Sequence, residues 1–250
     1  MKALLETSFG LKKIDLSSPI GIHLEIKNAQ SLGAWYVGPP SIGPHKTTDF
    51  IGSISEGAAV NFNDIAFNPH AHGTHTECLG HIVAGDYTIM QIMSQFIFEA
   101  LVISVAPKHL DGDLIIDRDL ISGAITGTTV PQVLVIRTLP NEDSKKLKNY
   151  SHTNPAYLSE AAAIFIRELG VQHLVVDLPS VDKEEDGGAL LAHKAFWDVG
   201  GALRTHATIT EFVYVPSEIK DGPYALQFGL APFANDASPS SVFLYLFENS

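Results

Sequence analysis

The alternation of apolar and polar positions predicts a chain with several buried strands. Short apolar runs, most of them rich in β-branched residues, have the length and composition expected of strands. They indicate a fold built around a sheet. These runs cover residues 101–105, 133–136, 174–176, 208–215 and 242–247.

The clearest helix is predicted over residues 155–169, where apolar side chains recur at three-to-four-residue spacing and fall on one face. Gly170 supplies a stop directly after it. The helix leads into the apolar run at residue 174, which is an α-then-β step. Two further helices are predicted over residues 189–196 and 86–98, the latter being the weaker. Residues 140–154 are polar and charged and are predicted to form a surface excursion.

Length and composition favour one large domain with a substantial core. The 250 residues contain no evident linker, and 45% of them are hydrophobic, which supplies enough apolar material for a core. We therefore treat residues 1–250 as a single α/β or α+β domain. The net charge of −12 argues against a protein that grips phosphate backbones, because that task needs clustered Lys and Arg. Nucleic acid is not expected as a partner.

The lack of a signal-peptide pattern and the use of a single cysteine predict a cytoplasmic protein. Glu6 stands where a signal peptide would need a continuous apolar stretch. No run of about 18 apolar residues is present, so no membrane span is expected. Cys78 is the single cysteine, which excludes an intrachain disulfide and gives no sign of a secreted disulfide scaffold.

A cluster of histidines is the strongest chemical signal in the chain. Four histidines fall within residues 70–81, where a uniform distribution along the chain would put roughly half of one. A Gly-Thr pair interrupts the cluster, so His70 and His72 are expected to share one side of an extended segment, and His75 and Glu77 one side of the next. Their imidazole and carboxylate groups can then converge. The clustered histidines are His70, His72, His75 and His81.

Imidazole nitrogens and carboxylate oxygens form a ligand set that suits Zn²⁺, Mn²⁺ or Fe²⁺. The absence of cysteine pairs argues against a closed structural zinc site. A catalytic metal site keeps a position open for water and lowers the pKa of that water, which makes it a nucleophile. This is the simplest way to hydrolyse an amide without a serine or cysteine. For any single histidine, a surface or hydrogen-bonded core role is the alternative, but the group is harder to explain in that way.

Two further places carry polar groups of interest. Residues 177–188 follow a predicted strand and are strongly acidic, so they form either a solvated loop or the rim of a cationic site. His193 lies on the predicted helix after them. Glu211 lies within the strand predicted over residues 208–215, where a carboxylate is costly unless it is paired or bound to metal.

The sequence resembles the cyclase family of metal-dependent hydrolases, which includes bacterial kynurenine formamidases and isatin hydrolases. The family's central motif is His, any residue, Gly-Thr-His, any residue, Asp, and a further His four residues beyond that Asp. The resemblance implies a mixed β/β/α, swivelling-domain-like fold in a single domain, assembled as a homodimer or homotetramer. Its pieces are Ile14-Asp-Leu-Ser-Ser-Pro19, Gly73-Thr-His-Thr-Glu77 with His81, Leu134-Val-Ile-Arg-Thr138, residues 158–170 and 177–182, His193, Glu211 and Asp236-Ala-Ser-Pro239.

The resemblance also implies roles for individual residues. By position, His75 and Glu77 resemble the second His and the Asp that bind metal, with the carboxylate bridging when two ions are present. His193 and Glu211 resemble the distal metal ligands, and His81 resembles the catalytic histidine that carries protons. The implied cofactor is one or two Zn²⁺ ions, with Mn²⁺ as the alternative. The implied substrate is a small molecule with an amide-type C–N bond, either an aryl formamide such as N-formylkynurenine or a cyclic amide.

The sequence departs from the family pattern at three places. The family carries His two residues before the glycine, but here that place is Ala71, flanked by His70 and His72, so one extra residue has entered. Either histidine could be the ligand, and we favour His70 because a proline precedes it. Glu77 replaces the usual Asp, and its extra methylene changes the reach of the carboxylate. Leu79 stands where the family commonly has Pro.

Other readings of the sequence remain open. The Glu77 change motivates one in which the protein binds metal without turnover and acts as a binding or assembly module. A serine hydrolase is disfavoured because no Gly-x-Ser-x-Gly elbow is present. Cys78 is expected to be a small packing residue rather than a nucleophile. Neither the dinucleotide fingerprint nor a phosphate-binding loop is found. Aromatic side chains that could line a pocket for an aryl group, although such residues more often belong to the core, are Phe62, Phe67, Trp197 and Phe233.

Overall fold

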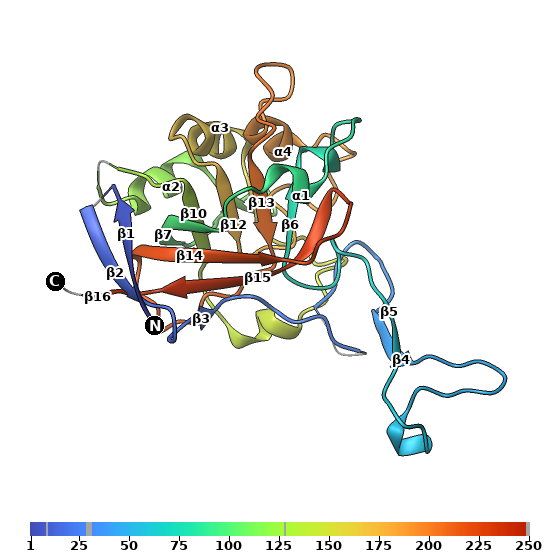
Figure 1. Ribbon diagram of the computed structural model, residues 1–250. Helices are drawn as coiled ribbons and strands as arrows, with labels where there is room; N and C mark the ends of the chain where they lie inside the picture. The colour runs from blue at the N-terminus through green and yellow to red at the C-terminus, as the bar shows by residue number, and fades with distance from the viewer. Residues whose placement is uncertain (9, 29–31, 128, 249–250) are drawn as a thin grey trace.

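Strand pairing closes the central sheet on itself. The computed structural model describes residues 1–8, 10–28, 32–127 and 129–248. Its eight-stranded sheet has the order β14-β7-β10-β12-β13-β6-β15-β3, and β14 also pairs with β15, so every strand except β3 belongs to a closed ring (Figure 1). The strands are β3 (Ile20–Gly21), β6 (His75–Cys78), β7 (Ile97–Val105), β10 (Val133–Thr138), β12 (His173–Val176), β13 (Thr208–Glu211), β14 (Gly222–Leu230) and β15 (Ala237–Tyr245).

The parallel part of the ring determines where the helices lie. β7, β10, β12 and β13 run parallel to one another, whereas β6, β14 and β15 pair antiparallel with their neighbours. Parallel neighbours need long crossover connections, and each crossover contains one α-helix. All three helices cover the same side of the sheet (Figure 1). They are α2 (Arg118–Ala124), α3 (Glu160–Glu168) and α4 (Leu191–Phe196).

Strand β10 shows how the core is divided between the two faces of the sheet. All six of its residues are buried, as expected of a parallel strand covered on both sides. Leu134 and Ile136 pack into the cluster that includes the helices, whereas Val133 and Val135 pack into the cluster inside the ring. This period of two is the alternation of side chains along a pleated strand.

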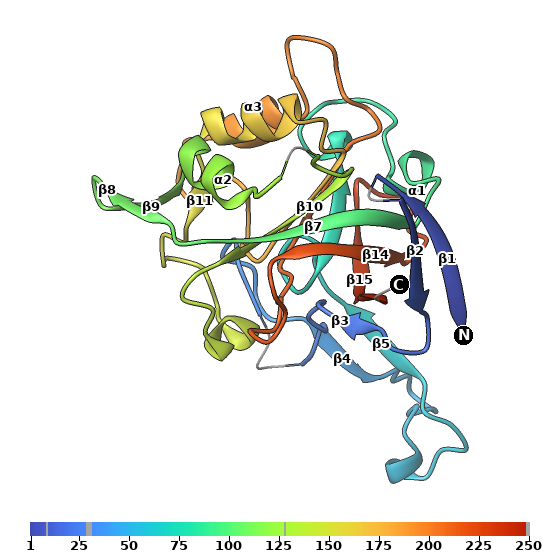
Figure 2. The same cartoon turned by 90° about the vertical axis from the view of Figure 1, so that its left-hand side faces the viewer.

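Smaller elements surround the ring. The strands β1 (Lys2–Thr7), β2 (Gly10–Asp15) and β16 (Phe247–Glu248) form one sheet, and β8 (Lys108–Leu110), β9 (Asp113–Ile116) and β11 (Tyr157–Leu158) form another. Figure 2 shows the β8–β9 hairpin projecting on the side away from β1 and β2. The remaining helices are short: α1 (Ile89–Ile92), η1 (Ile54–Glu56), η2 (Leu79–His81) and η3 (Asp143–Leu147).

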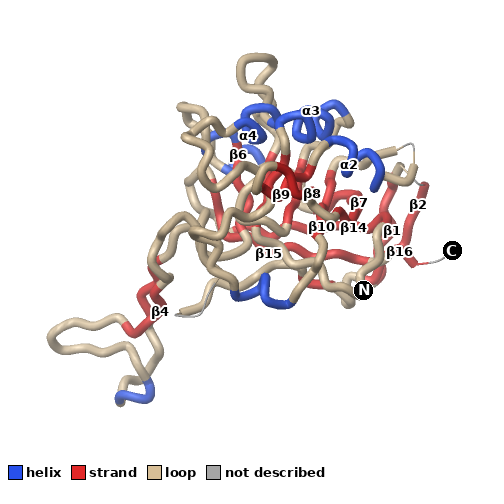
Figure 3. Tube along the Cα trace, turned by 180° about the vertical axis from the view of Figure 1, so that it is seen from behind, coloured by secondary structure: helices blue, strands red, loops and turns tan. Residues whose placement is uncertain are grey.

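A two-stranded hairpin forms an arm that extends away from the body of the molecule (Figures 1 and 3). It consists of β4 (Ser41–Pro44) and β5 (Asn63–Ala66), which pair antiparallel with each other only. Several large apolar side chains on the arm are exposed, among them Ile54, Phe62 and Ile65. The arm joins the body close to the histidine cluster.

Most of the predicted strands are confirmed, and the fold is mixed α/β as expected. The predicted strand over residues 208–215 ends early, at Glu211. The predicted run over residues 242–247 spans the end of β15 and the start of β16. The surface position of residues 140–154 is confirmed, since most of them are exposed.

The helix predictions were less accurate. The helix expected over residues 155–169 begins only at Glu160, because Ser159 caps it by accepting a hydrogen bond from the Ala162 amide. It stops where expected, at Gly170, whose φ is +83°. The expected helix over residues 189–196 is present as α4. The helix predicted over residues 86–98 is wrong: only Ile89–Ile92 is helical, and from Ile97 onward the chain pairs with β14, joined by β10 from Ala100. This strand pairing outweighs the local helical pattern.

Membrane insertion through a helix finds no support in the described part of the chain. No helix there is both long and apolar enough to cross a bilayer.

Candidate metal centre

Strand β6 places His75 and Glu77 side by side at the centre of the site. Residues two apart on a strand point to the same face, and both side chains are completely buried. In the antiparallel pairing of β6 with β13, Glu211 lies directly opposite His75. The two side chains approach to 3.4 Å between His75 Nε2 and Glu211 Oε2. The buried carboxylate of Glu211 is therefore paired with His75, and it also accepts a hydrogen bond from the Val181 amide, which offsets the cost of burying its charge.

Helix α4 supplies His193 from the other side. Asp182, in the loop after β12, accepts hydrogen bonds from the backbone amides of Ala192 and His193 and contacts His193 Nδ1 at 2.5 Å. This contact leaves Nε2 of His193 facing Glu77 Oε1 at 3.0 Å. The loop therefore fixes both the start of the helix and the orientation of the imidazole ring.

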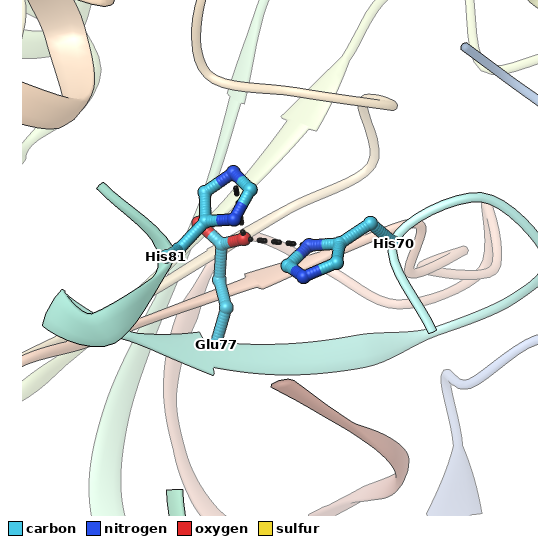
Figure 4. Close-up of side chains that lie close together, drawn as sticks. All are labelled: His70, Glu77 and His81. Atoms are coloured by element: carbon cyan, nitrogen blue, oxygen red, sulfur yellow. Dashed lines mark ion pairs between the residues drawn. The ribbon is translucent and has the colours of Figure 1, made fainter. Parts of the chain in front are cut away.

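His70 and His81 complete the group from the two ends of β6. His70 lies in the turn before the strand, and His81 lies in the 3₁₀-helix η2 after it. Figure 4 shows both rings directed toward the carboxylate of Glu77. His70 Nδ1 is 3.1 Å and His81 Nε2 is 3.7 Å from Glu77 Oε2, and the two rings stack with centroids 4.2 Å apart.

His72 points elsewhere, so the expectation that His70 and His72 share one side is wrong. The chain turns between them instead of running extended. His72 Nδ1 accepts a hydrogen bond from the backbone amide of Asn68, and its Nε2 donates to the carbonyl of Gly38. Both ring nitrogens are thereby occupied by backbone groups. Of the two alternatives for the ligand, the geometry favours His70.

The carboxylates raise the pKa values of the histidines they face. At His70, burial lowers the pKa, but contacts with Asp236 and Glu77 outweigh burial and raise it to about 10. At His193, burial is likewise outweighed by Asp182 and Glu77, and the pKa is again raised to about 10. Negative potential at the centre therefore favours a positive charge on each ring.

Glu77 is the common neighbour of these groups. Its burial raises the pKa of the carboxyl, but His81, His193 and His70 lower it well below its ordinary range. The side chain is therefore a buried anion. Such a group is expensive unless cations or hydrogen-bond donors surround it.

Two buried polar atoms at the centre, Nε2 of His75 and Oε2 of Glu77, make no hydrogen bond of good geometry among the described residues. Their nearest oppositely charged atoms, Glu211 Oε2 at 3.4 Å and His70 Nδ1 at 3.1 Å, are ion-pair contacts only. An unsatisfied buried polar atom costs about 1–3 kcal/mol. The possible ligand atoms of His75, Glu77 and Glu211 lie within 4.8 Å of one another, and so do those of His70, Glu77 and His81. The nitrogen and oxygen donors suit Zn²⁺ or Mn²⁺. The residues present therefore fit a divalent cation, and Glu77 is shared by both groups.

A comparison with known protein families identifies the family of this chain. A family model described as "Putative cyclase" matches residues 14–183, more than half of the sequence. The chain belongs to the Cyclase family. Among curated proteins, none matches it.

Solved structures share the fold of this Cyclase family member. A potential metal-dependent hydrolase with cyclase activity superposes with a TM-score of 0.65 at 16% identity, covering 93% of this chain and 99% of the other. Isatin hydrolase A from Labrenzia aggregata, bound to benzyl benzoate, gives 0.67 at 13% identity, with 92% and 94% covered. Isatin hydrolase A from Ralstonia solanacearum gives 0.64 at 14% identity, with 92% of each chain covered. At these identities the likeness concerns the fold.

The cavity beside the centre of this Cyclase family member has a volume of about 290 Å³. The acidic loop after β12 forms part of its wall, through Ser180, Asp182 and Glu184. The one Lys or Arg in the described lining is Lys183, which is paired with Asp113 at 2.7 Å. No unpaired Lys or Arg therefore faces this cavity from the described residues.

Only part of the expected aromatic pocket lies near a cavity. Phe67 and Phe233 line a separate apolar cavity of about 370 Å³. Trp197 is fully buried, with its indole N–H donated to the Ala207 carbonyl, so it is a core residue. Phe62 is exposed on the arm.

Sequence reasoning assigned no role to two acidic residues of the site, Asp182 and Asp236. Asp182 lies within the acidic stretch over residues 177–188, which the sequence predicts to be a loop or the rim of a cationic site, and both residues lie in stretches that resemble the family but carry no assigned role. Asp236 precedes β15 and contacts His70 Nε2 at 2.9 Å. An isolated Asp gives no periodic signal, so only the strand pairing brings Asp236 to the centre.

Proposed function

We propose that this chain is a metal-dependent hydrolase of amide-type C–N bonds. The observation that carries the proposal is the pair of buried atoms without a hydrogen bond, His75 Nε2 and Glu77 Oε2, at the meeting point of the two ligand groups. Buried polar groups in native proteins nearly always have partners. A divalent cation would satisfy both atoms and offset the buried charge of Glu77.

The proposed ligands are His70, His75, Glu77, His193 and Glu211. Glu77 contacts His193 through Oε1 and lies nearest His70 through Oε2, so its two oxygens face different partners. This arrangement supports one or two ions, with Zn²⁺ as the first choice and Mn²⁺ as the alternative. When bound, such an ion polarises a carbonyl oxygen and lowers the pKa of a water molecule.

His81 is proposed as the proton carrier of the reaction. Its side chain is 31% exposed, whereas His75 and His193 are buried, and it lines the cavity. A bound substrate can therefore reach its ring. In this proposal His81 takes a proton from the attacking water and donates one to the leaving nitrogen, as a general acid–base group does.

The cavity supports a small uncharged substrate. Because its described lining offers no unpaired Lys or Arg, a substrate carboxylate would find no such partner there and would face the acidic loop after β12 instead. A cyclic amide or a simple aryl formamide fits better on this basis than an amino acid such as N-formylkynurenine. The kinship with isatin hydrolases in fold supports the cyclic amide.

Elemental analysis of the purified protein tests the proposal. The wild type should contain one or two equivalents of Zn or Mn, and His75→Ala should contain far less. His45→Ala is the matched control, because His45 lies on the arm and pairs with Asp64 at the surface. A wild-type protein that contains no metal and takes up none would contradict the proposal.

Turnover is tested separately with a panel of cyclic amides and aryl formamides, each with and without a carboxylate. We expect metal-dependent hydrolysis, with the uncharged compounds preferred. The second candidate is a metal-binding module without turnover, which the longer Glu77 side chain favours. Retention of metal together with no hydrolysis across the panel would support that candidate.

Two further expectations from the sequence stay predictions. One is a homodimer or homotetramer, which sedimentation equilibrium would test. The other is a cytoplasmic location, which fractionation of cells would test.

A further inference from the structure

Asp236 is held in place by the backbone of the site. It precedes β15, and its carbonyl accepts a hydrogen bond from the Cys78 amide at the end of β6. The neighbouring Asn235 carbonyl accepts one from Ile89. The carboxylate of Asp236 is therefore presented from a fixed point and not from a mobile loop.

One oxygen of this carboxylate meets two histidines. Asp236 Oδ2 lies 2.9 Å from His70 Nε2 and 3.4 Å from His81 Nδ1. The other nitrogens of the two rings, Nδ1 of His70 and Nε2 of His81, face Glu77. Each ring is thus placed between an inner carboxylate and an outer one, and the two rings stack at an interplanar angle of 25°.

In the metal-loaded protein, where a ligating histidine is neutral, this geometry defines the tautomer of both rings. A neutral imidazole has one N–H and one lone pair, and the hydrogen bond made by one nitrogen determines the role of the other. If His70 Nε2 and His81 Nδ1 donate to Asp236, both lone pairs point toward Glu77. His70 then presents a lone pair to a cation, and His81 presents one that can accept a proton.

We propose that Asp236 is a positioning residue that fixes the tautomer and orientation of His70 and His81 together. The inference rests on the proposed function and adds a residue to it. Asp182 contacts His193 on the opposite side of the centre, but it serves a single ring. Asp236 couples a metal ligand to the proton carrier through one oxygen.

The experiment compares Asp236→Asn, Asp236→Ala and the matched control Asp64→Asn, which removes the carboxylate facing His45 at the surface. Affinity for Zn²⁺ alone is measured by competition with a chromophoric chelator. Loss of a carboxylate that orients a ligating histidine costs about 10–100-fold in metal affinity. We expect a loss near the lower limit for Asp236→Asn, a larger loss for Asp236→Ala, and none for Asp64→Asn.

A second readout separates positioning from a merely structural role. ¹⁵N spectra of the Zn²⁺-loaded, histidine-labelled protein report which ring nitrogen carries the proton. The wild type should show one tautomer each, with the proton on His70 Nε2 and His81 Nδ1, and the Asp236 variants should show mixtures. Asp236→Asn has the same shape as the native residue, so it carries the test even if Asp236→Ala fails to fold.

The outcomes are distinguishable. Unchanged affinity and unchanged tautomers in Asp236→Asn, with Zn²⁺ lost in His75→Ala, would overturn this inference alone. Retention of Zn²⁺ in His75→Ala would overturn the proposed function and this inference with it.

Discussion

Acid should destabilise this protein through His173, a buried histidine at the start of β12. The loop that carries Asp182 follows the other end of this strand. Its ring packs against Phe98 and Phe228, with centroids 4.4 and 5.9 Å away, and its Nδ1 contacts Thr208 Oγ1 at 2.9 Å. Burial in this apolar setting, assisted by nearby positive charge, lowers the pKa of His173 from 6.5 to about 4. The folded protein therefore keeps this ring neutral at pH values where the unfolded chain protonates it.

The pH window follows from these two pKa values. Between about pH 6.5 and pH 4, the unfolded state binds a proton at His173 that the folded state does not, so stability falls as the pH falls. Above and below this window, both states carry the same charge at this residue. A difference of two to three pKa units corresponds to about 3 kcal/mol, and for a domain of this size the melting temperature would drop by roughly 6–12 °C.

Urea denaturation of the metal-free protein at several pH values between 7 and 4 measures this effect. Chelator is included because a bound cation would add its own pH dependence. The substitution His173→Gln keeps a polar side chain that cannot titrate, and the control is His109→Gln at an exposed position on β8. The comparison uses the slope of unfolding free energy against pH, so any constant loss from altered packing cancels.

The wild type and His109→Gln should lose stability together as the pH falls. His173→Gln should lose about 3 kcal/mol less across the window. Equal slopes for all three proteins would refute the reasoning, because they would mean that the folded state accepts a proton at His173 as readily as the unfolded chain.

Three further predictions concern the site. His70→Ala should lose metal on dialysis, whereas His72→Ala should keep it and lose about 1–3 kcal/mol of stability from the backbone groups left unpaired; metal analysis and thermal melts check both. Cys78→Ala should retain turnover, because burial raises the pKa of this thiol to about 11 and keeps it protonated at neutral pH; substantial loss of kcat in a folded variant would contradict this. Glu77→Asp withdraws the carboxylate from its partners and should lower kcat/KM by about 100-fold, the scale of a displacement near 1 Å. Steady-state kinetics measures this change, and an unaltered kcat/KM would contradict the prediction.

The central residues of the site could be predicted because their signals are local. His75 and Glu77 obey the two-residue period of a strand, and that period alone places them on one face. Glu211 was conspicuous as a carboxylate within an apolar run. Its position opposite His75 could not be predicted, because register between strands far apart in sequence has no local signature.

Other features depended on contacts that a linear pattern does not contain. A turn and the carbonyl of Gly38, more than thirty residues earlier, determine that His70 and not His72 faces Glu77. Residues 86–98 have a helical pattern, yet pairing of β7 with the distant strand β14 outweighs it from Ile97 onward. Asp182 gave only a general acidic signal, since its role depends on the position of α4.

The turn over residues 68–72 and strand β6 differ in how they tolerate a change in chain length. One residue inserted between His75 and Glu77 would send the two side chains to opposite faces of the sheet and destroy the site. One residue added in the turn leaves the strand register intact and merely changes which histidine reaches Glu77. The turn is therefore the adjustable side of the coordination shell, and libraries that vary its length or sequence should alter metal preference without disturbing the barrel.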